Sequence, residues 1–499
     1  MKNGEKVNSY NELKKINEKI HNLSHLGAIT SWDQQTMMPK GSNDARSKAM
    51  AEFTVLMHQL STDPKISDLL NEASKEDLNE TDRSTLREMK RSYELSTVVP
   101  EDLVKAKSLA GSKCEHAWRE QKPNNDWKGF LTNFEDVVKL SREEASIRSS
   151  KSGLTPYDSL LDIYEPGMNT EKLDVIFSDV KSWLPTLIEE IVEKQKSYNT
   201  VLPTGPFSIE KQKELGLKVM KKLGFDFDKG RVDISSHPFC GGVPEDIRMT
   251  TRYDESDFVQ SLMGIVHETG HARYEQNLPK EYVALPSGTA RSMGIHESQS
   301  LFFEMQIGRG RPFLESIHKD IVDAFGDTKE FQIDNLVKIY NHVEPGFIRV
   351  DADEVTYPAH VILRYEIERD LINGKLEAKD IPEVWNEKMK AYLGLNTEGN
   401  YTQGVLQDIH WTDGSFGYFP SYTLGAMYAA QQFSSVKKLY PNVNDSISNG
   451  DYSQAFSWLK ENIWEKGSLF LTDDLIKNAT GESLNPKFLK EHLTSRYLK

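Results

Sequence analysis

One segment of the chain, residues 257–277, constrains the fold more than any other because it combines a helical pattern with two histidines. Apolar residues recur there at intervals of three and four, which predicts a helix with one buried face; they are Phe258, Leu262, Ile265 and Val266. Residues four apart project from the same side of a helix, so His267 and His271 can share one metal ion. Glu268 lies about 100 degrees around the helix from His267, outside the ligand set but within reach of a water molecule that the metal activates. The pattern predicts a hydrolytic zinc centre with Glu268 as general base.

A zinc ion in a hydrolase normally takes three protein ligands, so a third must come from elsewhere in the chain. A third histidine six residues after the second would stand at Asn277, which excludes that arrangement. Glu297 begins an apolar helical run and is the predicted third ligand, while Glu304 on the same stripe either orients a ligand or is an ordinary solvated residue. Glu275 is a rival, but it diverges from the two histidines on the metal helix. Glu281, another rival, follows a proline in a predicted turn.

Six motifs in residues 237–411 resemble those of the M32 family of metallocarboxypeptidases, the carboxypeptidase Taq group. They are His237-Pro238-Phe239, Asp246-Ile247-Arg248-Met249-Thr250, His267-Glu268-Thr269-Gly270-His271, His296-Glu297-Ser298-Gln299, Ile348-Arg349-Val350-Asp351-Ala352-Asp353 and Gly404-Val405-Leu406-Gln407-Asp408-Ile409-His410-Trp411. Residues 31–39 are also similar to the opening of the family. The resemblance implies an enzyme that releases single C-terminal amino acids from peptides, with broad side-chain tolerance, and that is usually a homodimer. Cobalt and manganese remain alternatives to zinc, because two imidazoles and a carboxylate accept all three.

A carboxypeptidase also needs a cation that binds the terminal carboxylate of its substrate. An arginine can make two parallel hydrogen bonds to a carboxylate, and Arg349 is the first candidate. Acidic residues follow it in the chain, and they either hold its side chain in position or are merely neutralised by it. Arg248 is a weaker candidate; if residues 246–250 form a strand, it shares one face with Asp246 and Thr250.

Amide hydrolysis further requires donors that stabilise the oxyanion of the tetrahedral intermediate. His410 and Tyr422 are the candidates, in an aromatic, glycine-punctuated segment that predicts a loop lining a cleft. The alternative is that both are simply buried among aromatic neighbours.

Two extended segments, residues 231–239 and 246–253, flank a glycine- and proline-containing connection at 240–244 and predict a β-hairpin beside the metal helix. An exposed strand edge there can pair with an extended peptide through main-chain hydrogen bonds. A hairpin without any role in substrate binding is the alternative.

The fold class predicted for the 499 residues is a mainly α, two-lobed helical metallopeptidase with a deep cleft and a small sheet beside the metal helix. No Pro/Gly/Ser-rich linker divides the chain, so we expect a single unit. Residues 1–200 would form a helical lobe over the cleft, and residues 201–499 would carry the metal site.

Net charge and cysteine content indicate the setting. A formal net charge of -15 argues against nucleic acid or an anionic membrane as partner. The first ten residues lack the apolar core of a signal peptide, and two distant cysteines suit a reducing compartment, so a cytoplasmic location is expected. Three functions remain open: a metallocarboxypeptidase acting on peptides with a free C-terminus, an endopeptidase or dipeptidase of the helical oligopeptidase type, and a catalytically silent peptide-binding protein.

Overall fold

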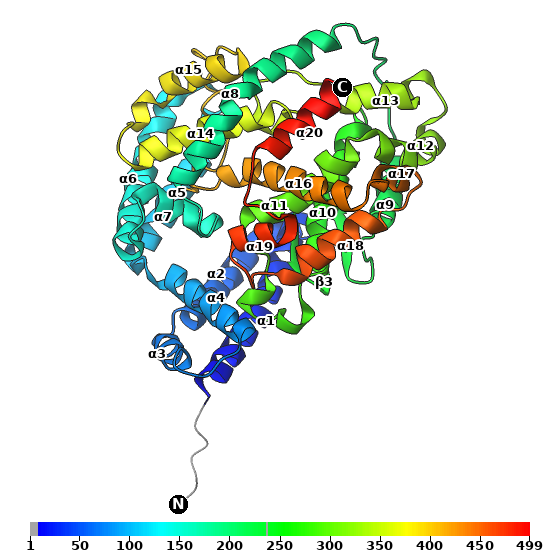
Figure 1. Cartoon of the computed structure of the whole chain (residues 1–499). Helices are drawn as coiled ribbons and strands as arrows, with labels where there is room; N and C mark the ends of the chain where they lie inside the picture. Colours follow the sequence, from blue (N-terminus) through cyan, green and yellow to red (C-terminus); the bar gives the residue numbers. More distant parts are fainter. Residues whose placement is uncertain (1–7, 236–237) are drawn as a thin grey trace, which may run out of the picture.

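A computed structural model describes residues 8–235 and 238–499, which form a mostly helical molecule with one small three-stranded sheet (Figure 1). This arrangement confirms the predicted fold class. The helices before the sheet are α1 (Ser9–Thr36), α2 (Asn43–Ser61), α3 (Pro64–Ala73), α4 (Glu80–Thr97), α5 (Glu101–Gln121), α6 (Trp127–Ser152), α7 (Pro156–Tyr164), α8 (Thr170–Gln195) and α9 (Ile209–Lys222). His237 of the first motif lies outside the described residues.

The longer helices after the sheet are α10 (Phe258–Gln276), α11 (Met293–Leu301), α12 (Arg311–Phe325), α13 (Ile333–Tyr340), α14 (Tyr357–Ile372), α15 (Ile381–Leu393), α16 (Pro420–Leu439), α17 (Val443–Ser448), α18 (Ser453–Asn462), α19 (Thr472–Thr480) and α20 (Lys487–Tyr497). Across the described part of the chain, no helix is long and apolar enough to span a membrane.

Three hydrophobic cores organise these elements, and the smallest packs β3 against α9 and α10. Helices α1, α3 and α4 bury a small core, which includes Tyr10, Leu13, Leu70 and Met89 and is completed by Leu285, and these helices project from the rest of the molecule in Figure 1. The largest core runs from α5 to α20 and surrounds α10 and α14. The division into lobes near residue 200 stays a prediction.

The sheet differs from the predicted hairpin. Its strands are β1 (Gly230–Ile234), β2 (Cys240–Val243) and β3 (Asp246–Thr251), in the spatial order β1-β3-β2. The two segments expected to form the hairpin, β1 and β3, pair in parallel, and the expected connection is itself the strand that pairs antiparallel with β3. The prediction was wrong because glycines in residues 240–244 indicated a turn, whereas the turn is confined to residues 244 and 245. The sheet therefore presents β2 as an edge strand.

Two glycines allow the central helices to approach closely. A Cβ atom at Gly270 on α10 would lie 2.5 Å from the carbonyl oxygen of Gln299 on α11. A Cβ atom at Gly425 on α16 would lie 2.7 Å from Cγ of Glu297. Helix α11 is therefore packed directly between α10 and α16. It continues into a π-helical segment, η4 (Phe302–Gly308), a distortion that is frequent at functional sites.

Candidate active site

A cavity of about 1460 Å³ lies between the N-terminal helices and the central helices, as expected for a deep cleft. Helices α1, α4, α10 and α11 all contribute to its wall, together with strand β2. The predicted site residues His267, Glu268, His271, Glu297, Arg349 and Tyr422 line it. Arg248 and His410 are not among its lining residues. The cavity thus brings together six of the eight residues singled out in the sequence.

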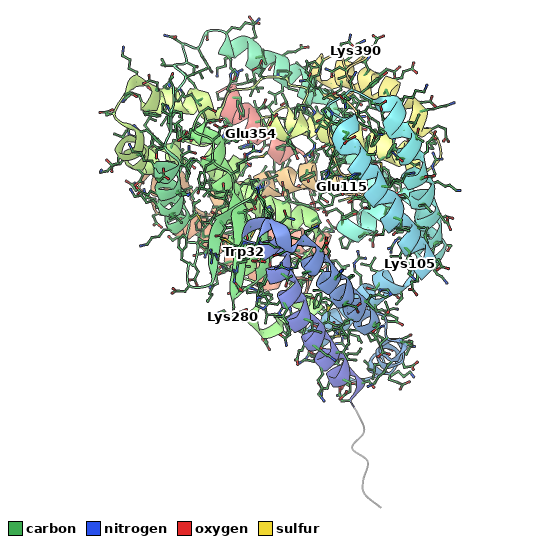
Figure 2. The ribbon with its side chains drawn as sticks, turned by 180° about the vertical axis from the view of Figure 1, so that it is seen from behind. Trp32, Lys105, Glu115, Lys280, Glu354 and Lys390 are labelled. Carbon is green, nitrogen blue, oxygen red and sulfur yellow. The ribbon has the colours of Figure 1, made fainter. Side chains whose placement is uncertain are left out.

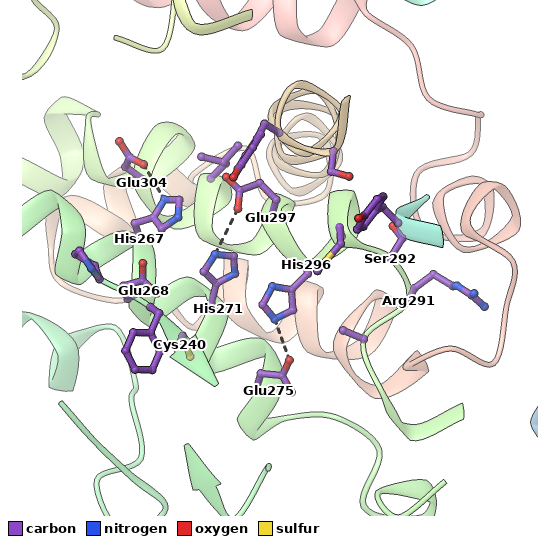
Figure 3. A pocket seen from close by; sticks show the side chains of 18 of the residues that line it. Cys240, His267, Glu268, His271, Glu275, Arg291, Ser292, His296, Glu297 and Glu304 are labelled. Carbon is purple, nitrogen blue, oxygen red and sulfur yellow. Dashed lines mark hydrogen bonds and ion pairs between the residues drawn. The ribbon is translucent and has the colours of Figure 1, made fainter. Parts of the chain in front are cut away.

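The predicted ligands converge at the centre of this cavity (Figure 3). One donor atom each from His267, His271 and Glu297 lies within 4.8 Å of the other two. The two histidines come from α10 and the glutamate from α11, which the close approach at Gly270 brings beside it. His271 Nε2 lies 3.4 Å from Glu297 Oε2. Two imidazoles and one carboxylate in this arrangement fit a catalytic zinc ion.

The charges around the imidazoles also favour a cation. Burial opposes protonation of His267, yet its hydrogen bond to Glu304 and the charges of Glu297 and Glu304 raise its pKa to about 10. Burial lowers the pKa of His271 to about 4, so at neutral pH this imidazole is uncharged and can act as a metal ligand. Carboxylates that attract a proton this strongly in a buried site also attract a divalent ion.

Two charged side chains, those of Glu304 and Arg309, support His267 on the Nδ1 side of its ring. Its Nδ1 lies 2.9 Å from Oε2 of Glu304, which leaves Nε2 for a metal. Arg309 in turn donates from Nη2 to Oε1 of Glu304 over 2.7 Å. Glu304 belongs to the π-helical segment, so its contact with His267 does not follow the continuous α-helical stripe that the sequence indicated. A carboxylate in this place fixes the tautomer and the ring orientation of a ligating histidine.

Glu268 lies beside the ligands without joining them. Its side chain is buried, and its Oε2 has no hydrogen-bond partner among the described residues. Burial raises its pKa to about 7, while the charge of His267 opposes the rise. A carboxylate with such a pKa is suited to accept and return a proton near neutral pH.

Arg349 is held at the cavity wall by a buried ion pair. Its Nε donates to Asp408 Oδ1 over 2.9 Å, and its Nη1 donates to the hydroxyl of Tyr357 over 2.8 Å. Asp408 also accepts from Nε of Arg364 over 2.7 Å. Nη2 of Arg349 has no hydrogen bond or ion pair to any described residue. The acidic residues that follow Arg349 in the sequence do not pair with it. Its partner is Asp408, 59 positions further along the chain.

The other two candidates lie differently. Arg248 pairs with Asp246, from Nη2 to Oδ2 at 2.9 Å, and its guanidinium carbon lies 4.7 Å from the ring centroid of Trp32 on α1. Figure 2 labels Trp32 where α1 meets the sheet. His410 lies behind Tyr422, with Nε2 3.3 Å from the tyrosine hydroxyl. Burial lowers the pKa of His410 to about 4, so the imidazole is neutral.

Three residues of the site escaped the sequence analysis: Arg309, Tyr357 and Arg364. Arg364 is fully buried on α14, a helix buried on nearly all sides. It directly follows the apolar run Val361-Ile362-Leu363, and an arginine in such a place is a signal of a buried ion pair, since an unpaired buried charge is costly. Arg309 and Tyr357 carry no comparable signal in the sequence.

A His-Glu-x-x-His helix, a glutamate from a second helix that meets the two histidines, and a further buried glutamate beside them are typical of the site of a metallopeptidase. Residues 12–497 match the family model described as carboxypeptidase Taq (M32) metallopeptidase. The chain is 36% identical to carboxypeptidase 1 of Bacillus subtilis over 484 residues, 96% of each protein. It is also 36% identical to thermostable carboxypeptidase 1 of Thermus thermophilus over 501 residues, 98% of each.

The solved structure of metallocarboxypeptidase 1 of Trypanosoma cruzi superposes with a TM-score of 0.97 at 48% identity, covering 98% of this chain and 99% of that one. The chain therefore belongs to the M32 family of metallocarboxypeptidases and is a metallopeptidase enzyme.

Proposed function

We propose that this enzyme removes single amino acids from the free C-terminus of peptides, and that Arg349 binds the terminal carboxylate. The observation that carries the proposal is the charge of the buried cluster around Asp408. Two guanidinium groups, those of Arg349 and Arg364, share this one carboxylate, and all three side chains are less than a tenth exposed. The cluster therefore has one unmatched positive charge at the wall of the cavity that contains the metal ligands. A substrate carboxylate would neutralise it through the free Nη2 of Arg349.

The main chain of the substrate would bind along strand β2. This strand is at the edge of the sheet, and Cys240, Gly242 and Val243 line the cavity. An extended peptide can add to such an edge through backbone hydrogen bonds, which do not depend on its side chains. Binding of this kind would account for broad side-chain tolerance.

His267, His271 and Glu297 would hold the metal, which we take to be zinc, with cobalt and manganese as alternatives. Bound there, the ion would supply Lewis acidity for the attack of water on the last peptide carbonyl. Glu268 would take the proton of the attacking water and deliver it to the departing amine. Tyr422 would donate a hydrogen bond to the developing oxyanion, with His410 contributing from behind it.

The setting of the enzyme is part of the same proposal. We expect a cytoplasmic homodimer that acts on peptides rather than on nucleic acid or membranes. Both cysteines are free, which suits a reducing compartment. The dimer is expected from the family, and sedimentation of the purified protein tests it.

Mass spectrometry of one peptide in three forms tests the proposal: free at both ends, acetylated at the N-terminus, and amidated at the C-terminus. The expected result is stepwise loss of C-terminal residues that amidation blocks, acetylation permits and a chelator abolishes. Internal cleavage of the amidated peptide would instead indicate an oligopeptidase, and no cleavage by metal-loaded protein would indicate a peptide-binding protein.

A further inference from the structure

A second imidazole–carboxylate pair lies next to the metal ligands. His296 Nε2 lies 2.9 Å from Oε1 of Glu275 (Figure 3). Glu275 is four residues after His271 on α10, and His296 immediately precedes Glu297 on α11. Glu275, considered above as a rival metal ligand, is thus engaged by His296 and stands outside the ligand set.

The imidazole of His296 stacks on the imidazole of His271. The ring centroids are 4.4 Å apart, and the ring planes differ by 19°. By contrast, the rings of His267 and His271 are nearly perpendicular, at 84°. Of the two histidine ligands, only His271 therefore has an aromatic ring lying flat against it among the described residues.

The two histidine ligands also differ in how their second nitrogen is held. Nδ1 of His267 contacts Glu304, as ligating histidines normally contact a carboxylate or carbonyl. Nδ1 of His271 is buried and has no hydrogen-bond partner among residues 8–235 and 238–499. With no partner on Nδ1 and only the 3.4 Å contact of Nε2 with Glu297, the plane of the His271 ring depends on packing more than on hydrogen bonds.

We propose that His296, held in place by Glu275, is the positioning residue for His271. The stacked ring restricts rotation of the His271 imidazole about its Cβ–Cγ bond and so keeps Nε2 directed at the position shared with Glu297. Glu275 prevents His296 from turning away into the cavity, which both residues line. The pair does for His271 what Glu304 and Arg309 do for His267, by contact between ring faces instead of a hydrogen bond.

The spacing of the two helices does not depend on this pair. The absence of a side chain at Gly270 already lets α10 and α11 touch at Gln299 and Ser300. Removing the His296 ring should therefore release the orientation of His271 while the helices stay in contact. This separates the proposed role from a general structural one.

Three variants test the proposal: His296→Ala, which removes both stacking and hydrogen bond; His296→Phe, which retains a flat ring without the hydrogen bond; and Glu275→Gln, which retains an acceptor. The readouts are metal affinity by chelator competition and the visible spectrum of the cobalt-loaded protein. We expect His296→Ala to weaken metal binding about 10-fold or more and to change the cobalt spectrum. His296→Phe should stay within about threefold of the unaltered protein with an unchanged spectrum, because an apolar ring is not drawn into a water-filled cavity and stays stacked without Glu275. Glu275→Gln should also stay within about threefold, because its amide oxygen still accepts from His296.

Each result decides the proposal. An unchanged metal affinity and cobalt spectrum in His296→Ala would overturn it, and a raised KM in that variant would then assign His296 to substrate contact. Equal losses in His296→Phe and His296→Ala would show that the hydrogen bond matters rather than the stacked ring, and would also overturn it. The inference rests on the metal site of the proposed function. If the unaltered protein binds no metal, the proposed function is refuted. If it binds metal but the variants depart from the expected pattern, only this inference is refuted.

Discussion

The side chains of Arg349 and Asp408 form a buried ion pair, with 2.9 Å between Nε and Oδ1, although 59 residues separate them in the chain. Asp408 pairs with Arg364 at the same time, so the pair is held rigidly but is not electrically balanced. A carboxylate brought by the substrate would restore the balance. Selection of a free C-terminus would thus depend on α14, which carries Arg364, and on the loop before α16, which carries Asp408.

Replacing Glu268 by Gln should leave metal binding intact and lower kcat about 10²- to 10⁴-fold, since the amide cannot accept the proton of the attacking water. Metal content and kcat of the purified variant check this. Loss of metal from the variant would instead make Glu268 a ligand, and retained turnover would remove it from the mechanism.

Tyr422→Phe should lower kcat about 10²- to 10³-fold with little change in KM, because its hydroxyl would act only on the oxyanion. His410→Ala should have a smaller effect, since His410 contacts the tyrosine hydroxyl and does not line the cavity. Steady-state kinetics of the two variants compare them. A larger loss in His410→Ala than in Tyr422→Phe would contradict this order.

Glu304→Gln should weaken metal binding about 10- to 100-fold. A glutamine has a single carbonyl oxygen, which can serve either His267 or Arg309, whereas the carboxylate serves both. Chelator competition measures the change. An affinity equal to that of the unaltered protein would mean that His267 needs no partner for its Nδ1.

The buried carboxyl group of Glu368 should make stability depend on pH. It accepts hydrogen bonds from Tyr157, Trp411 and the backbone of Gly417, and burial raises its pKa to about 7. Because the folded pKa lies above the unfolded one, its contribution is fully present at acidic pH and declines as the pH rises from about 5 to about 7. The free energy of unfolding of the unaltered protein relative to Glu368→Gln should fall over this range. A difference that is constant or grows with pH would contradict the prediction.

Features that depend on local periodicity were predictable from the sequence. His267 and His271 share a helix, so their spacing alone indicated a common metal, and the apolar run after Glu297 located the second helix. The family motifs indicated the fold class, which the structure confirms. These features need no knowledge of contacts between distant segments.

Features that depend on long-range pairing were not predictable. The acidic residues directly after Arg349 were the predicted partners of its guanidinium, but the actual partner is Asp408. The connection at residues 240–244 proved to be a strand because its register with β3 is set by the sheet and not by its glycines. Arg364 pairs with Asp408, 44 positions away, and Arg309 reaches Glu304 through the π-helical segment, a distortion that the sequence did not indicate.

The most direct test of the central claim compares kcat/KM for one peptide as the free acid and as the C-terminal amide, in the unaltered enzyme and in Arg349→Gln. The unaltered enzyme should prefer the acid by about 100-fold or more, because only the acid neutralises the cluster around Asp408. Arg349→Gln should lose most of this preference while retaining its metal. An Arg349→Gln enzyme that still discriminates against the amide as strongly as the unaltered protein would contradict the assignment of Arg349 to the terminal carboxylate.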